Sequence, residues 1–240
     1  MEIPCYYCGS VNIVKNGHTY YGKQRGKCKD CNRQFVFERD TTQLSPEQKE
    51  LVGKLLLERL SLEGICRVLS ITAYQLYRYM DQLYEQVPSN LHAQVPEDAQ
   101  IELQSIDIES DELWSFVARK TNKQWVWVAQ ERSTRQIIAF YIGNRGEEGA
   151  QGLWDRIPEV YKQKACFYTD CWEAYRKVIP KHQHKPVEKA ETNHIERFFC
   201  TIRQRCSRLV RKALSFSKNQ ERHKMAIRFF IAQYNLSLLV

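Results

Sequence analysis

The 240-residue chain is predicted to be an α/β protein in which a mixed sheet flanked by helices follows two small modules. Three observations favour this class. Two Cys-x-x-Cys pairs lie near the start, three short helical stretches follow them, and strand-like and helical stretches then alternate to the end. A stretch with two prolines and no periodicity lies in between. The predicted parts are a cysteine-rich module over residues 1–42, a trihelical module over 43–87, a linker over 88–100 and the main domain over 101–240.

Composition and charge indicate a folded protein with a polyanionic partner. Hydrophobic residues make up 43% of the chain, which is ordinary for a globular protein, and no apolar run is long enough for a membrane span. The start lacks the layout of a signal peptide, so a cytoplasmic protein is expected, associated with the prokaryotic nucleoid if it binds DNA. The net charge of +8 is divided into +3 over residues 1–40, −3 over 41–191 and +8 over 192–240. Basic ends favour nucleic acid over a membrane surface, because the C-terminal segment has no amphipathic anchor outside its own core face.

The cysteine-rich module is predicted to be a zinc ribbon. Each Cys-x-x-Cys pair presents two thiolates from one tight turn, and two such pairs complete a tetrahedral zinc shell. Two disulfides or unrelated thiols are the alternatives, and the lack of a secretory signal disfavours disulfides. Four protein thiolates leave no open coordination position, so the zinc is expected to be structural. The predicted ligands are Cys5, Cys8, Cys28 and Cys31, and the basic residues expected to contact phosphates include Lys23, Arg25 and Lys27.

Residues 45–85 have the proportions of a helix-turn-helix. Proline follows Ser45 at the first position of the first predicted helix, Ser61 begins the second, and Thr72 with Gln75 forms a capping box for the third. A trihelical bundle without a nucleic-acid role is the alternative, but the neighbouring basic ribbon favours DNA. The last helix would then enter a major groove, with Tyr74, Gln75, Tyr77 and Arg78 as candidate contacts.

The main domain begins with three predicted strands and ends with two long predicted helices. Between them lie a helix, a strand, a helix and a further strand. The predicted strands are 101–117, 124–130, 135–142, 165–169 and 183–187, and the predicted helices are 147–156, one from about 172, 191–213 and 218–236.

Three acids fall at positions where this order of elements can bring them together. Asp111 lies in the first strand, Asp170 directly follows a short apolar strand, and Glu196 lies near the start of a long helix. Carboxylates suit two Mg²⁺ or Mn²⁺ ions, which stabilise the attacking and leaving oxygens of a displacement at phosphorus. Solvated surface charges are the alternative. The order of elements and the places of the acids match a ribonuclease H-like core, with Asp107 as the alternative to Asp111.

The first of the two closing helices is predicted to run over residues 191–213 with one buried stripe. Its apolar residues are spaced four and three apart: Ile195, Phe199, Ile202, Cys206, Leu209 and Ala213. Arg203 lies two turns after Glu196 on the same edge of that stripe. The basic residues on the other sides are expected to contact phosphates, namely Arg197, Arg208 and Arg211.

Several segments of this sequence resemble DDE transposases of the insertion-sequence-1 family. They are DELWSFV (111–117), YTDCWEAY (168–175), NHIERFFCTIRQ (193–204) and LVRKALSFSK (209–218), together with the order of the modules. The resemblance implies that Asp111, Asp170 and Glu196 are the catalytic metal ligands and that Arg203 contacts DNA near them.

The activity implied by the resemblance is that of a Mg²⁺-dependent transposase. Such an enzyme would bind the terminal inverted repeats of its element, cleave the strand there and transfer it into double-stranded target DNA. Joining two element ends requires more than one copy of the chain, so a homo-oligomer in a synaptic complex is expected. The alternatives are a repressor with a non-catalytic ribonuclease H-like domain and a nuclease without strand transfer.

Overall fold

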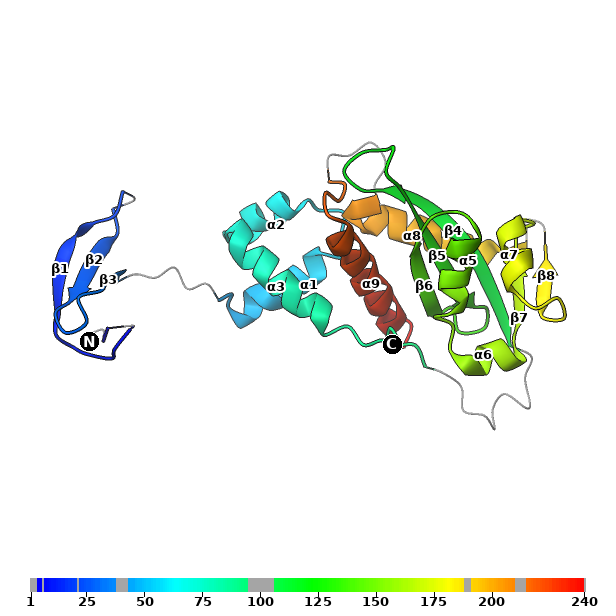
Figure 1. The fold of residues 1–240 in the computed structure, drawn as a ribbon, viewed down its shortest axis with the longest axis horizontal. Coiled ribbons are helices and arrows are strands. Elements are labelled where there is room, and N and C mark those ends of the chain that lie inside the picture. Colours follow the sequence, from blue (N-terminus) through cyan, green and yellow to red (C-terminus); the bar gives the residue numbers. More distant parts are fainter. Residues whose placement is uncertain are drawn as a thin grey trace. The chain divides into compact units, whose positions relative to one another are not determined.

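The computed structural model divides the chain into two units, Met1–Ser45 and Pro46–Val240, which are described separately (Figure 1). The structure describes residues 4–5, 7–20, 22–37, 43–94, 106–187, 191–209 and 215–239. None of the helices in these ranges combines the length and the apolarity needed to span a bilayer.

The first unit is a three-stranded antiparallel sheet with a very small core. Its strands β1 (Ile13–His18), β2 (Gln24–Cys28) and β3 (Gln34–Val36) lie in sequence order. Gly26 leaves room for the ring of Phe37 in the middle of β2, because a Cβ at that position would lie 2.7 Å from the ring. The buried hydrophobic cluster of this unit consists of Cys5, Cys28 and Phe35, with Ile13, Cys31 and Phe37 packed against it. Cysteine side chains therefore make up a large part of this small core.

The second unit begins with the three predicted helices, α1 (Pro46–Leu55), α2 (Leu62–Leu69) and α3 (Ala73–Glu85). The Ser61 hydroxyl caps α2 by accepting a hydrogen bond from the backbone N–H of Gly64 at 3.0 Å. The capping box predicted at the start of α3 is present, because Thr72 and Gln75 each accept a backbone N–H from the other. Local caps thus fix where these short helices begin.

A five-stranded mixed sheet forms the centre of the second unit (Figure 1). β5 is antiparallel to both β6 and β4, whereas β7 is parallel to β4 and β8 is parallel to β7. The strand order is β6-β5-β4-β7-β8, so the first strand of the sheet lies in its middle. Their bounds are β4 (Asp107–Phe116), β5 (Lys123–Glu131), β6 (Ile137–Gly143), β7 (Cys166–Thr169) and β8 (His184–Pro186).

Helices flank this sheet, and the whole arrangement fits a ribonuclease H-like core. Residues from α5 (Glu147–Trp154), α6 (Glu159–Lys164) and α7 (Glu173–Val178) share one apolar cluster with the sheet. Successive strand residues point to opposite faces. Ile108 therefore lies in that cluster, whereas the next residue, Glu109, contacts α8 (Asn193–Arg205).

The helix α9 (Gln220–Ser237) ties the trihelical segment to the sheet. The buried amide of Asn235 accepts the N–H of Ile137 at 2.8 Å and donates to the carbonyls of Ile137 and Leu91, each at 2.9 Å. Arg222 also pairs with Asp81 of α3 at 2.9 Å. One helix therefore joins the edge strand β6, α3 and the chain that follows α3.

The single helix predicted over residues 191–213 is wrong. α8 ends at Arg205, Cys206 is extended, and a 3-10 turn, η2 (Ser207–Leu209), follows. Cys206 and Leu209 are nevertheless buried, because a turn with three residues per repeat also returns a side chain to the same side. The apolar spacing therefore continued past the true end of the helix. Ala213 lies outside the described residues.

Two other elements differ from the prediction. The short helix α6 was not predicted, since six residues are too few to show a helical period. Residues 88–94, expected to be part of a linker, form turns in which Leu91 and Ala93 are buried. The rest of the predicted linker and the first five residues of the predicted strand 101–117 lie outside the described residues.

His223 of α9 is buried between two serine hydroxyls. Its Nε2 lies 3.1 Å from Ser115 Oγ and its Nδ1 lies 2.9 Å from Ser217 Oγ. Burial, with a smaller contribution from the charge of Arg208, lowers the pKa of His223 from 6.5 to about 4. The folded protein therefore holds this ring neutral at a pH where the unfolded chain protonates it.

We expect this histidine to make the free energy of unfolding fall by about 2 kcal/mol between pH 7 and pH 5, because only the unfolded state gains the proton. Urea unfolding of the wild-type protein and of His223→Gln at both pH values measures the effect. The variant should lose this part of the pH dependence. An equal change in the free energy of unfolding between the two pH values for both proteins would contradict the expectation.

Candidate metal centre

The four predicted zinc ligands meet at one end of the first unit. The Sγ atoms of all four lie within 4.8 Å of one another. Cys5 and Cys31 are 3.6 Å apart at sulfur, as are Cys8 and Cys28. A tetrahedral zinc with Zn–S bonds of about 2.3 Å places its sulfurs about 3.8 Å apart, so the cluster fits a zinc ion. All nine cysteines are free thiols.

Two tight turns present these sulfurs. Gly9 donates its N–H to the carbonyl of Cys5 at 2.8 Å with a φ of +76°, which favours glycine. In the second turn, the Cys28 N–H bonds the Arg33 carbonyl at 3.0 Å. Asp30 links the turns by accepting hydrogen bonds from Ser10 and Asn12. The geometry is thus held by the backbone around the thiols.

In the second unit, strand pairing brings two of the three predicted acids together. Asp111 lies in the middle of β4, and Asp170 directly follows Thr169, the last residue of β7. Because Ser110 pairs with Thr169 in parallel register, the next residue of each strand lies side by side. One carboxylate oxygen from each of Asp111, Glu112 and Asp170 lies within 4.8 Å of the others.

Asp111 and Asp170 each use one oxygen for a local hydrogen bond. Asp111 Oδ1 accepts the N–H of Glu112 at 2.7 Å, and Asp170 Oδ1 accepts the N–H of Trp172 at 3.0 Å. Neither has a cationic partner among the described residues. The remaining oxygens are hard donors of the kind that Mg²⁺ and Mn²⁺ prefer, so the pair fits such an ion.

Glu112, which the sequence analysis did not single out, is bound by the protein itself. Arg145 Nε donates to its Oε1 at 2.9 Å and the Tyr175 hydroxyl to its Oε2 at 3.1 Å. The guanidinium of Arg145 lies between the rings of Trp125 and Trp172, 4.6 and 4.4 Å from their centroids. Since both oxygens of Glu112 have protein partners, this residue supports the site rather than offering a free ligand.

The electrostatics of the pair are those of a cation site. Burial is the largest cause that raises the pKa of Asp111, to about 7, and the charges of Glu112, Asp170 and Glu196 raise it further. Arg145 compensates Glu112, but no described Lys, Arg or His side chain compensates Asp111 or Asp170. A bound divalent cation would relieve that repulsion.

Glu196 lies on α8 and is near enough to affect Asp111, but it is not part of the tight group. The charge of Glu196 helps to raise the pKa of Asp111. Glu196 is nevertheless exposed, and its oxygens lie outside the group within 4.8 Å. Asp107, the alternative first acid, begins β4 opposite Cys166, the first residue of β7, whereas Asp170 follows the last residue of β7. Asp107 is likewise outside the group.

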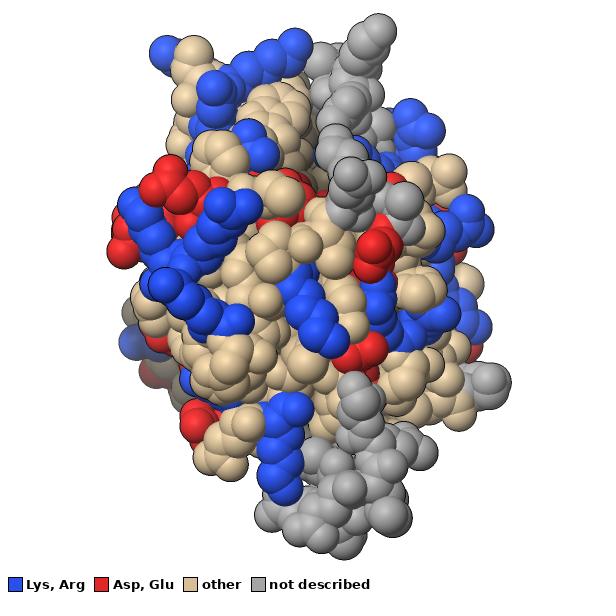
Figure 2. Space-filling model, turned by 90° about the vertical axis from the view of Figure 1, so that its right-hand side faces the viewer, with Lys and Arg blue, Asp and Glu red and all other residues tan. Residues whose placement is uncertain are grey.

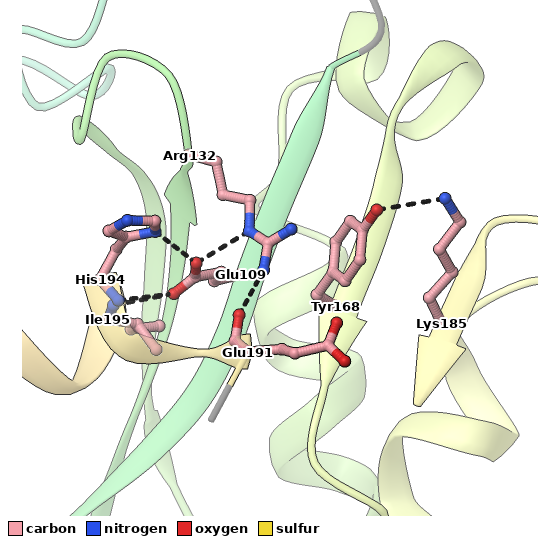
Figure 3. A network of polar contacts seen from close by, with 7 residues as sticks. All are labelled: Glu109, Arg132, Tyr168, Lys185, Glu191, His194 and Ile195. Carbon is pink, nitrogen blue, oxygen red and sulfur yellow. Dashed lines mark hydrogen bonds and ion pairs between the residues drawn. The ribbon is translucent and has the colours of Figure 1, made fainter. Parts of the chain in front are cut away.

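A second buried acid, Glu109, holds the start of α8 (Figure 3). Its carboxylate is fully buried and accepts the backbone N–H groups of His194 and Ile195 at 3.1 and 2.9 Å. The His194 ring lies 2.6 Å away and Arg132 Nε 2.9 Å. The sequence analysis missed Glu109, because its partners are 23 to 86 residues away in the chain.

The predicted DNA contacts on α8 and beyond are only partly on one surface. Arg197 is exposed beside Glu196, and Arg203 lies two turns after Glu196 on α8. Arg208 is not on α8 but in η2, where it donates to the Ser215 carbonyl at 3.3 Å. Arg211 lies outside the described residues.

The other predicted DNA contacts lie on α3 and on the small sheet. On α3, Tyr74 is 63% exposed and Arg78 is exposed, whereas the Gln75 side chain is engaged in the capping box. The remaining predicted contacts are half-buried and lie on or beside β2: Lys23, Arg25 and Lys27.

Some acids of the middle segment are buried, whereas several of its basic residues are exposed. Figure 2 shows Lys and Arg side chains distributed over the end of the second unit that carries α7 and β8. Several acids of this segment are instead buried inside the protein: Glu109, Glu112 and Glu131. The exposed basic residues at this end are Arg176, Lys177, Lys181 and Lys185.

Comparison with known proteins places this chain in a family. A family model described as IS1 transposase matches residues 105–236. The insertion element iso-IS1n protein InsB of Shigella dysenteriae is 33% identical over 126 residues, which are 52% of this chain and 94% of that protein. The IS1 protein InsB of Shigella flexneri is 31% identical over 123 residues, or 51% of this chain and 92% of that protein.

We expect Arg145→Met to lower the free energy of unfolding by about 1–3 kcal/mol, because the buried Glu112 carboxylate loses its charged partner. Adding Glu112→Gln should recover part of this loss, since a neutral amide needs no cation. Urea unfolding of the wild type and of the single and double variants measures the difference. A double variant less stable than Arg145→Met would contradict the expectation.

Proposed function

Because the chain belongs to the IS1 transposase family, we propose that it binds the terminal inverted repeats of its own element and catalyses metal-dependent strand cleavage and strand transfer. The observation that carries the proposal is the pair formed by Asp111 and Asp170 at neighbouring parallel strands, with the charge of Glu196 on α8 near enough to raise the pKa of Asp111. Such a protein would act on DNA in the bacterial cytoplasm, at the nucleoid.

The proposed catalytic residues are Asp111, Asp170 and Glu196. Divalent cations such as Mg²⁺ or Mn²⁺ held there would stabilise the attacking and leaving oxygens of a displacement at phosphorus. Asp111 and Asp170 would bind the cations from β4 and from the end of β7. Glu196 would add a further carboxylate ligand from α8. Arg203 and Arg197 hold phosphates of the same strand.

Neither of the two chemical steps requires a covalent bond between the DNA and the protein. In the first, water attacks the phosphodiester at the element end, the bond from phosphorus to the 3′ oxygen breaks, and a 3′-hydroxyl is left. In the second, that hydroxyl loses its proton and attacks a target phosphodiester. A new phosphodiester forms as the target's 3′ oxygen leaves and takes up a proton.

DNA recognition is proposed to lie before the catalytic domain, with residues 1–42 as a zinc ribbon, 43–87 as a helix-turn-helix and 88–100 as the connection to 101–240. In this proposal α3 enters a major groove with Tyr74 and Arg78, and the basic residues of β2 contact the backbone. The zinc has a structural role, since four thiolates occupy its coordination positions. Two element ends are held by a homo-oligomer.

A repressor that keeps the fold but not the chemistry is the second candidate. Its support is the fully engaged Glu112, which shows that carboxylates here also serve the fold. Against it stands the absence of any protein cation on Asp111 and Asp170 among the described residues, because a purely structural pair of acids would need one.

We expect Asp170→Asn to lower Mg²⁺-dependent nicking of a plasmid that carries both ends of the element by roughly 100-fold or more. The asparagine oxygen still accepts the Trp172 N–H, so the fold and DNA binding should be retained. Asp155→Asn, which changes an exposed aspartate of the same unit, is the matched control. Nicking by neither the wild type nor the control would support the repressor, and nicking without joined products would support a nuclease.

We also expect one zinc ion per chain, and loss of zinc in Cys28→Ser with weaker binding to element-end DNA. The reason is that the small sheet has its buried core at the cysteines and depends on the metal. Cys200→Ser, at an exposed thiol on α8, should keep both properties. Metal analysis and electrophoretic mobility shifts measure them, and a zinc-free wild-type protein that binds DNA would contradict the expectation.

A further inference from the structure

We propose that Glu109 is a positioning residue, which fixes the start of α8 to β4 and thereby sets where Glu196 stands relative to Asp111. The inference rests on the proposed function of the three acids and adds a residue that does not touch metal or DNA. It concerns the network drawn in Figure 3.

The start of α8 has no cap of its own. Thr192 at the N-cap position makes no side-chain hydrogen bond to the helix, which leaves the first N–H groups to find other partners. Glu109 supplies that acceptor from another element, because its Oε2 receives the N–H groups of both His194 and Ile195. A carboxylate at a helix N-terminus is also favoured by the helix dipole.

Glu109, the anchor of α8, is itself held in place by other residues. Arg132 Nε donates to Glu109 Oε1 at 2.9 Å, and Arg132 also donates to the carbonyl of Glu191, just before α8. The guanidinium stacks on the ring of Tyr168, 3.9 Å from its centroid. Lys185 of β8 bonds the Tyr168 hydroxyl at 3.1 Å. The network therefore joins β4, β7 and β8 to the residues on both sides of the helix start.

The position of Glu196 is set through the backbone of α8, whose start is bound by Glu109 and whose buried residues Ile195 and Phe198 pack the helix in place. Among the described residues, no hydrogen bond or ion pair holds the Glu196 carboxylate. It lies one residue after Ile195, whose N–H is bound by Glu109. Glu109 is two residues before Asp111 on the same face of β4, about 7 Å along the strand. The strand β4 therefore carries Asp111 directly and holds the helix of Glu196 through Glu109.

The experiment is a double-mutant cycle on Mn²⁺ affinity, measured by titration calorimetry on the zinc-loaded full chain without DNA. Glu196→Gln should weaken Mn²⁺ binding roughly tenfold, and Glu109→Ala should do the same through loss of position. If Glu109 acts through Glu196, the double variant should be no weaker than Glu196→Gln alone.

Two further variants separate positioning from a general loss of stability. Glu109→Gln keeps an oxygen for the two backbone N–H groups but loses the ion pair with Arg132, so its Mn²⁺ affinity should lie between those of the wild type and Glu109→Ala. Glu131→Gln is the matched control, because Glu131 is also buried on the sheet but bonds Ser133 and Tyr161. It should keep wild-type Mn²⁺ affinity whatever its melting temperature.

Unchanged Mn²⁺ affinity in both Glu109 variants, or additive effects in the double variant, would overturn the positioning role while leaving the three acids as proposed ligands. Unchanged Mn²⁺ affinity in Glu196→Gln would also overturn the positioning role of Glu109, because Glu196 would then not be a ligand that needs positioning. That second result would also contradict the role given to Glu196 in the proposed function.

Discussion

The second unit is organised around two like-charged carboxylates that strand pairing forces together. The middle strand carries three acids within four residues, and the protein treats them differently. Glu109 is matched by Arg132 and Glu112 by Arg145, whereas Asp111 lies beside Asp170 and has no cationic partner in the described part of the chain. Repulsion within this pair opposes folding, and only the rigid register of β4 with β7 keeps the two side chains in place. Asp111 and Asp170 therefore form the candidate site, and the ion-paired Glu109 and Glu112 support it.

Much of this arrangement could be predicted from the sequence because its signals are local. The capping box of Thr72 and Gln75 needs only a four-residue pattern, and the cysteine pairs need only their spacing. The placement of Asp170 at a strand end followed from the short apolar run before it. A five-stranded sheet with flanking helices also followed from the alternation of elements, which is the pattern that a mixed sheet requires.

What the sequence did not reveal are interactions between distant parts of the chain. Glu109 and Glu112 resemble ordinary strand residues until their partners Arg132 and Arg145 are placed beside them. The end of α8 was missed for a related reason, since Cys206 and Leu209 remain buried after the helix has stopped.

The amide of Asn235 has a consequence for how the protein is made. It satisfies peptide groups at Ile137 and Leu91, about 100 and 145 residues earlier in the chain. While the ribosome is still synthesising α9, the outer edge of the sheet and the turn at Leu91 have neither this partner nor the apolar cover of the helix. The second unit can close only late in translation. A product that terminates before Gln220 would expose an unprotected sheet edge to proteases and to aggregation.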